Sequence, residues 1–213
     1  MPIPVDFDQR NLPIVELDPT GYLHIYSTKF TPPNPLYLSK GPSGRFNDPG
    51  PNRPDSYGVL YAAPNLITCV AEVVIRSGAN RRLAQDVAGR RGILAVKQNV
   101  DQSAVAELTI SPGQHVRLAD LRDIDLYLLG GDAEEINSLD YANSTQIWSE
   151  AIHVRPENVD GILYKSRFLN AHDSVAIFER GLKRVALTCT NTTPLTTHPD
   201  WWSVVSDLSL VVM

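Results

Sequence analysis

The sequence predicts an α+β fold with a largely antiparallel or mixed β-sheet and flanking helices. Patterns typical of helices and of strands are mixed along the 213 residues, without the strict alternation of a doubly wound parallel sheet. The length fits one domain, and 43% hydrophobic with 20% charged residues are globular values that allow a substantial core. We therefore expect an N-terminal arm over residues 1–20 and a single domain over residues 21–213.

The first third of the chain predicts two strands separated by a long loop. Residues 1–20 contain four prolines, which favour either an extended arm that wraps the domain or a loose leader. Tyr22–Tyr26 alternates and is aromatic, and Gly58–Ala63 is apolar, so both are expected to be strands. Seven prolines between residues 31 and 57 exclude a helix there, and such a loop inside a compact domain is usually functional or disordered.

A helix is expected to begin after Asn65, a residue type that caps helix N-termini well. Its apolar stripe is formed by Leu66, Ile67, Val70, Val73 and Val74. At 100° per residue, Glu72 lies nearly opposite the centre of this stripe. The periodicity therefore does not force Glu72 into the core, and its side chain faces either solvent or a cleft.

The remaining elements are predicted from the same patterns. Further strands are expected at Ile93–Asn99, Val105–Ile110, Val116–Leu121, Gly161–Arg167, Ser174–Glu179 and Val204–Val212, with Arg184–Leu187 continuing the sheet. Helices are expected at Arg81–Val87, Asp132–Leu139 and Asn143–Val154, the last capped by Asn143 or Ser144. Residues 189–200 are rich in Thr, Asn and Pro, which predicts a loop.

Charge, cysteine content and hydropathy exclude several classes of protein. A net charge of −5 argues against a general duplex-DNA binder, although a small nucleotide in a local basic pocket remains compatible. The sequence has no apolar run long enough to span a membrane and no secretory signal pattern, so the expected compartment is the cytosol. Cys69 and Cys189 are expected to be buried, reduced thiols. No phosphate-binding glycine loop, zinc motif or hydrolase elbow is present in the sequence.

Four residues are candidates for chemistry on a nucleotide. Arg45 follows a glycine in the proline-rich loop, Tyr61 ends an apolar strand, and Glu72 is a lone helical carboxylate. Ser166 follows a predicted strand. Each has a simpler explanation on its own: Arg45 as a solvated loop residue, and Tyr61 as a core or edge residue. Glu72 would then pair with Arg76 along the helix, and Ser166 would occupy a turn.

Read in order, these elements closely resemble the RES domain family. The resemblance rests on Arg45–Pro49, Gly58–Ala62, Ala71–Glu72, Gln146–Ser149, Asp160–Arg167 and Ser174–Phe178. It covers roughly residues 20–182. The family is named for an arginine, a glutamate and a serine, which fall here on Arg45, Glu72 and Ser166.

The resemblance implies an ADP-ribosyltransferase-like fold, with a split mixed or antiparallel β-sheet and an NAD-binding cleft. It also implies a toxin-like enzyme that consumes NAD⁺ by hydrolysis or phosphorolysis, with NAD⁺ as substrate and no cofactor or metal. The alternatives are an ADP-ribosyltransferase that modifies a protein and a non-catalytic nucleotide-binding or partner-binding domain. The implied partner is an antitoxin or an immunity protein, with no nucleic acid and no membrane. The implied compartment is the cytoplasm of the producing cell or, for an exported protein, of a target cell.

Breaking the nicotinamide–ribose bond builds positive charge on the ribose, which assigns an expected role to each residue. Glu72 would stabilise the cation, and Arg45 would grip the pyrophosphate with its fork of donors. Tyr61 would stack on nicotinamide, and Ser166 would orient Glu72 or the ribose. Many family members have a further arginine near the position of His24, and the nearby Lys29 is the expected substitute cation.

Overall fold

The computed structural model describes residues 3–50, 55–75, 83–85 and 91–213. The largest sheet has five strands in the order β1–β7–β8–β9–β3. Their bounds are Ile14–Leu17 for β1, Val59–Ala62 for β3, Val116–Asp120 for β7, Gly161–Lys165 for β8 and Asp173–Phe178 for β9. β7 and β8 pair in parallel and the other neighbours are antiparallel, which confirms the predicted α+β class with a mixed sheet.

A second, antiparallel sheet has the order β10–β6–β2. Its strands are β2 at Leu23–Ser27, β6 at Ser103–Thr109 and β10 at Thr188–Pro194. β2 and β3 meet where Leu23 and Ala63 exchange two backbone hydrogen bonds of 2.8 and 3.0 Å. Beyond this bridge the two strands belong to different sheets, so the β-structure is split at this point.

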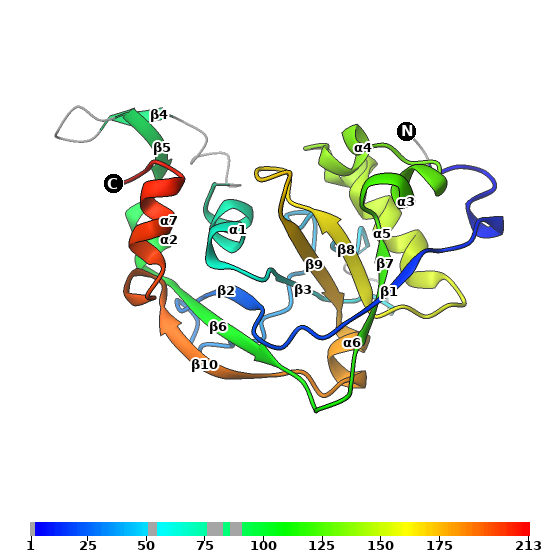
Figure 1. The fold of residues 1–213 in the computed structure, drawn as a ribbon, viewed down its shortest axis with the longest axis horizontal. Coiled ribbons are helices and arrows are strands. Elements are labelled where there is room, and N and C mark those ends of the chain that lie inside the picture. The colour runs from blue at the N-terminus through cyan, green and yellow to red at the C-terminus, as the bar shows by residue number, and fades with distance from the viewer. Residues whose placement is uncertain (1–2, 51–54, 76–82, 86–90) are drawn as a thin grey trace.

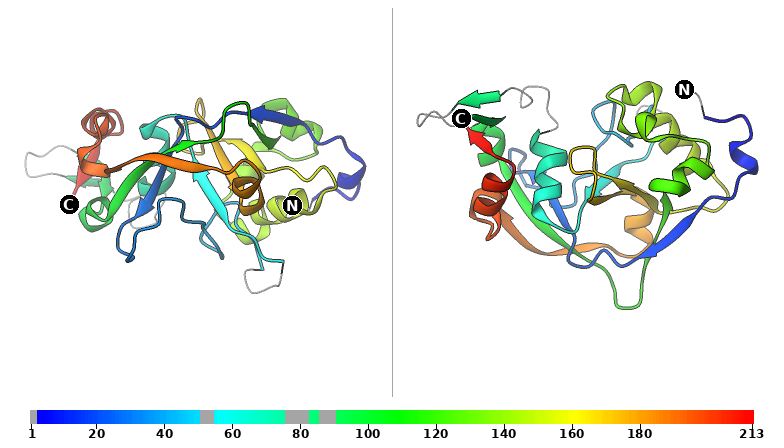
Figure 2. Two further views of the ribbon diagram at one scale, coloured as in Figure 1. Left: turned by 90° about the horizontal axis from the view of Figure 1, so that it is seen from below. Right: turned by 45° about the horizontal axis from the view of Figure 1, so that its top comes forward.

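Three short strands form a third sheet in the order β11–β5–β4. Their bounds are Leu83–Gln85 for β4, Arg91–Ala95 for β5 and Leu210–Val212 for β11. The α-helices are α1 Leu66–Val70, α2 Lys97–Asp101, α3 Asp123–Leu128, α4 Ala133–Asn137, α5 Thr145–Val154, α6 Glu179–Arg184 and α7 Trp201–Asp207. Short turns of helix occur at η1 Phe7–Gln9, η2 Ala71–Ile75, η4 Tyr141–Asn143 and η5 Leu195–Thr197. Figures 1 and 2 show α2 and α7 at one end of the molecule and α3, α4 and α5 at the opposite end.

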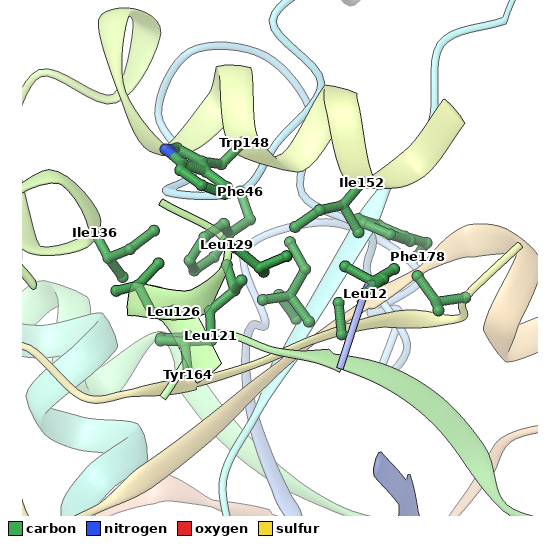
Figure 3. Packing of buried hydrophobic residues seen from close by; sticks show 14 of the residues in the cluster. Leu12, Phe46, Leu121, Leu126, Leu129, Ile136, Trp148, Ile152, Tyr164 and Phe178 are labelled. Carbon is green, nitrogen blue, oxygen red and sulfur yellow. The ribbon is translucent and has the colours of Figure 1, made fainter. Parts of the chain in front are cut away.

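The core of the five-stranded sheet is covered by α5 and by the proline-rich loop. Trp148 and Ile152 of α5 are 1% and 0% exposed, and both point toward the sheet in Figure 3. Phe46, from the loop, is fully buried in the same cluster, and its ring lies 4.7 Å from that of Tyr164. The proline-rich loop is thereby fixed on the domain by an apolar anchor next to Arg45.

The N-terminal arm wraps the domain instead of forming a loose leader. β1 adds an edge strand to the five-stranded sheet by antiparallel pairing with β7. The Arg155 guanidinium donates to the backbone carbonyls of Phe7 and Arg10, at 2.6 and 2.9 Å. The Phe7 ring packs edge-on against Trp148, with ring centres 5.4 Å apart. These contacts tie the first residues of the described chain to the main core.

Several predicted elements near the C-terminus were wrong. Residues 189–200 were predicted as a loop, but residues 189–194 belong to the strand β10, whose mostly exposed threonines suit a sheet edge because they are β-branched. The start of the predicted last strand lies in α7, where Trp201 and Val204 are buried at helical spacing. Arg184–Leu187 does not extend the sheet, because α6 is followed by a turn with Ala186 at φ 47°.

Two predictions in the middle of the chain also need correction. The predicted strand Ile93–Asn99 ends early, since Lys97 begins α2. Leu83–Gln85 is a strand and not part of a helix, while the rest of the predicted helix at 81–87 lies outside the described residues. Both cysteines are free thiols, as expected, but the predicted burial holds for Cys69 alone, since Cys189 in β10 is partly exposed. Across the described ranges, no helix is long and apolar enough to cross a lipid bilayer.

Candidate functional site

The proline-rich loop is held by side chains that satisfy its own backbone. The Asn47 amide donates to the Gly41 carbonyl at 2.8 Å, and the Gln146 amide of α5 donates to the Gly44 carbonyl at 2.8 Å. The Ser149 hydroxyl donates to the Phe46 carbonyl at 2.6 Å. A Cβ at Gly44 would lie 1.9 Å from the Asn47 side-chain oxygen, so the close approach of these residues requires glycine there. The loop therefore presents its neighbouring side chains in one fixed arrangement.

Arg45 belongs to this loop, and its side chain is buried, with 1% of its surface exposed. Its guanidinium donates to the Ile136 carbonyl through Nε at 2.8 Å and again through an η nitrogen, and to the Asn137 Oδ1 atom at 3.0 Å. It also lies over the Tyr164 ring, 4.9 Å from its centre. Burial lowers the pKa of the guanidinium. Arg45 thus joins the end of α4 to the core, and its expected contact with a phosphate has no geometric support in this arrangement.

Tyr61 connects the loop to β3 through its phenol. The hydroxyl donates to Asn47 Oδ1 at 2.9 Å and accepts from the Phe46 N–H at 2.8 Å. Its ring is only partly buried and forms part of the wall of a cleft. The phenol therefore fixes the ring in place, and the ring face is available to an aromatic group in the cleft.

Glu72 reaches the same cleft because the first helix changes its winding. Asn65 caps α1, as predicted, by accepting from the Thr68 N–H at 3.0 Å. After Val70 the chain continues as the π-helical turn η2. This wider turn shifts the phase of the side chains, so that Glu72 is 8% exposed and Val73 is 43% exposed. The prediction that Val73 belongs to the buried stripe was wrong for this reason.

The Glu72 carboxylate is oriented by the residues that follow β8. Its Oε1 atom accepts from the Ser166 hydroxyl at 2.7 Å and from the Arg167 backbone N–H at 3.1 Å. Ser166 is fully buried, and its own N–H donates to the His172 carbonyl at 2.8 Å. Its position is thus set by the β8–β9 hairpin. The structure therefore brings Glu72 and Ser166 into direct contact, although they are 94 residues apart.

His24 and Lys29 are placed differently from each other. The His24 Nδ1 atom lies 2.7 Å from the Tyr61 carbonyl and so must donate to it, while Nε2 has no partner within the described residues. Burial lowers the pKa of His24 to about 4, so the imidazole is neutral and cannot replace a cation. Lys29 is exposed, with its ammonium 5.0 Å from the centre of the Phe30 ring. It lines a neighbouring hollow and not the cleft itself.

The cleft has a volume of about 640 Å³ and lies where β2 and β3 diverge. Its lining is rich in aromatic rings and hydroxyl groups. The residues are His24, Ile25, Tyr26, Ser27, Tyr37, Ser39, Ser43, Val59, Tyr61, Glu72, Val73, Leu139 and Tyr141. Among these described residues, Glu72 carries the charge, so the cleft suits a ligand with a flat, uncharged or cationic part.

Arg167 is the residue of this region that the sequence patterns did not single out. Its guanidinium donates to the Ser138 carbonyl at 3.2 Å and to the Tyr141 hydroxyl at 3.3 Å, while its N–H holds Glu72. It therefore links the carboxylate to the cleft wall formed by Leu139 and Tyr141. Its position directly after Ser166 was the sequence feature that could have marked it as a residue of the site.

The structure is that of an α+β protein whose β-sheet is split, with the buried Glu72 carboxylate at the cleft between the two sheets. Comparisons with known proteins identify the family. The sequence matches the family model of the RES domain over residues 21–198, and the chain belongs to this family, as the sequence resemblance predicted. No curated protein matches the sequence significantly. A chain of the M. tuberculosis MbcT–MbcA toxin–antitoxin complex has a similar fold, with a TM-score of 0.56 and 12% identity over 84% of this chain and 85% of that chain. At this identity the likeness shows the fold alone.

Proposed function

We propose that this protein is a toxin that cleaves the nicotinamide–ribose bond of NAD⁺, with water or phosphate as the acceptor. The observation that carries the proposal is the Glu72 carboxylate at the cleft, with Oε1 fixed by Ser166 and Arg167. Membership in the RES domain family and a fold like that of a chain in a toxin–antitoxin complex support the same assignment. They also support an antitoxin as the partner of this chain.

In this mechanism the bond between the ribose C1′ carbon and the nicotinamide nitrogen breaks, and the bonding electrons leave with nicotinamide. The ribose acquires oxocarbenium character, so a negative charge nearby stabilises the transition state more than the ground state. The Glu72 Oε2 atom has no hydrogen-bond partner within the described part of the chain, and it can accept from a ribose hydroxyl. Water or phosphate then attacks C1′, and attacking water loses its proton to the solvent.

The other cleft residues would position the substrate. The ring of Tyr61 would stack on nicotinamide, since its hydroxyl is already used by Asn47 and Phe46. Ser166 would act through Glu72, because its hydroxyl donates to that carboxylate. Arg45 would act indirectly, by holding the end of α4 next to the cleft wall.

Nicotinamide release from NAD⁺ by the purified protein, with and without phosphate, tests the proposal. Glu72→Gln removes the negative charge and keeps the shape, so kcat should fall by about a hundredfold to a thousandfold. Glu134→Gln is the matched control because Glu134 is an exposed residue of α4, and its kcat should equal that of the wild type. Folded wild-type protein that releases no nicotinamide under either condition would overturn the proposal. Transfer of a tagged adenylate half to a protein would instead identify an ADP-ribosyltransferase.

A further inference from the structure

A second hollow adjoins the cleft and is not used by the mechanism above. It has a volume of about 220 Å³. It is lined by Ser27, Lys29, Val73, Val74, Asn99, Gln102 and Ser103. Ser27 and Val73 also line the cleft, so the two spaces are continuous at these residues. The exposed side chain of Val73 stands at their junction, one residue after Glu72.

The backbone around this hollow is held by hydrogen bonds, whereas the side chains of Asn99, Gln102 and Lys29 in its lining are uncommitted within the described residues. The Thr28 N–H donates to the Gln102 carbonyl at 2.8 Å, and the Ser103 hydroxyl donates to the Asn99 carbonyl at 2.7 Å. The first bond holds the end of β2 against the end of α2, and the second joins the start of β6 to α2. The side-chain amides of Asn99 and Gln102 make no hydrogen bond within the described residues, and the Lys29 ammonium contacts only the Phe30 ring there.

We propose that this hollow is the subsite for the adenylate half of the dinucleotide, an inference that rests on the proposed function. Asn and Gln amides recognise adenine because one amide can donate to N7 and accept from the N6 amino group. The lysine ammonium provides the positive charge that the phosphates need. Val73 and Val74 supply apolar surface for the face of the base.

The charges of the two spaces give the bound dinucleotide a direction. Glu72 carries a negative charge in the cleft, where the cationic nicotinamide riboside end belongs. Lys29 carries a positive charge in the adjoining hollow, where the phosphates belong. The reversed orientation would place phosphate beside the carboxylate and the nicotinamide cation beside the ammonium. The site therefore selects a dinucleotide over a nicotinamide compound that lacks the adenylate half.

The test compares NAD⁺ with nicotinamide mononucleotide, which keeps the scissile bond and one phosphate but lacks the adenylate half. The wild type should have the higher kcat/KM for NAD⁺. Asn99→Ala and Gln102→Ala should each lower the ratio of the two kcat/KM values by about tenfold, mainly through the KM for NAD⁺. Gln98→Ala is the control, since Gln98 is an exposed residue of α2 that does not line the hollow, and its ratio should equal that of the wild type.

Calorimetric titration with AMP gives a second readout that does not depend on catalysis. AMP should bind the wild type, and Lys29→Gln and Gln102→Ala should each weaken this binding by about tenfold. Cleavage of both substrates with an unchanged ratio in the Asn99 and Gln102 variants would overturn the subsite and leave the proposed function standing. Failure to cleave either substrate, with AMP binding that responds to the variants, would overturn the proposed function and retain a nucleotide subsite.

Discussion

The Glu72 carboxylate is held through one oxygen atom, and this asymmetry determines what its neighbours contribute. The Ser166 hydroxyl and the Arg167 N–H both donate to Oε1. The position of Oε2 is therefore set through Oε1, and Oε2 itself has no hydrogen-bond partner within the described residues. A carboxylate fixed in this way does not have to reorganise when positive charge develops beside it. Ser166 is therefore expected to affect the chemical step more than substrate binding.

Ser166→Ala should lower kcat by roughly tenfold to a hundredfold, with a smaller change in KM, because the carboxylate loses one of its two orienting donors. Steady-state nicotinamide release measures both constants. Ser111→Ala replaces an exposed serine and serves as the control. A variant with wild-type kcat and a raised KM would assign Ser166 to ribose binding instead.

His24 makes stability depend on pH. Burial lowers its pKa in the folded protein from 6.5 to about 4, so between these pH values the unfolded chain binds a proton that the folded chain excludes. The free energy of unfolding therefore falls as the pH falls from 6.5 toward 4. His24→Asn keeps a donor for the Tyr61 carbonyl and cannot titrate, so urea unfolding should show a shallower loss in this range. Parallel curves for both proteins would contradict the assignment.

At the scale of elements, the change from α1 to η2 decides which side chain reaches the cleft. Two hydrogen bonds to Asn65 Oδ1 fix the start of this segment, one from the Thr68 N–H at 3.0 Å and one from the Thr68 hydroxyl at 2.6 Å. The hydrogen bonds of Glu72 fix the start of η2. A π-helical turn is rare and is frequently found at functional sites, which agrees with the position of Glu72.

Asn65→Ala should lower the free energy of unfolding by about 1 kcal/mol, because the first turn of α1 loses its cap. Asn65→Asp keeps an acceptor oxygen for the Thr68 N–H and should recover most of the loss. Chemical denaturation of the three proteins checks both expectations. Equal stability of the alanine variant and the wild type would show that the cap contributes nothing.

The sequence predicted the elements whose pattern is local and missed those that depend on their neighbours. The Asn65 cap and the two buried strands β8 and β9 follow from residue type and periodicity. The strand β10 was missed because its polar residues form a strand only beside β6. The residue type at Glu72 indicated its chemistry, but its burial depends on a π-helical turn that a 100° periodicity cannot reveal.

At the scale of the whole molecule, Arg45 joins parts of the fold that are far apart in sequence. Its guanidinium connects the proline-rich loop to the end of α4, 91 residues away, and lies over Tyr164 of β8. The family arginine was predictable from the sequence, but its burial was not, since glycine-flanked loop arginines are usually solvated. In the structure its hydrogen bonds and its contact with the Tyr164 ring hold the loop, α4 and β8 together.

Arg45→Met should lower the free energy of unfolding by about 2 kcal/mol or more, because the buried Ile136 carbonyl loses its donors. Arg45→Lys should not restore stability, since a point charge cannot replace the planar fork that reaches both Ile136 and Asn137. Denaturation midpoints test this. Unchanged stability combined with a raised KM for NAD⁺ would instead return Arg45 to the role of a phosphate ligand.

The five-stranded sheet and the β10–β6–β2 sheet diverge from the bridge between Leu23 and Ala63, and the cleft lies between them. A molecule bound in the cleft would contact both sheets, through His24 and Tyr26 of β2 and through Val59 and Tyr61 of β3. A bound molecule would therefore restrict the motion of the two sheets relative to each other. An inhibitor protein that inserted into the same cleft would stabilise the fold as well as exclude the substrate.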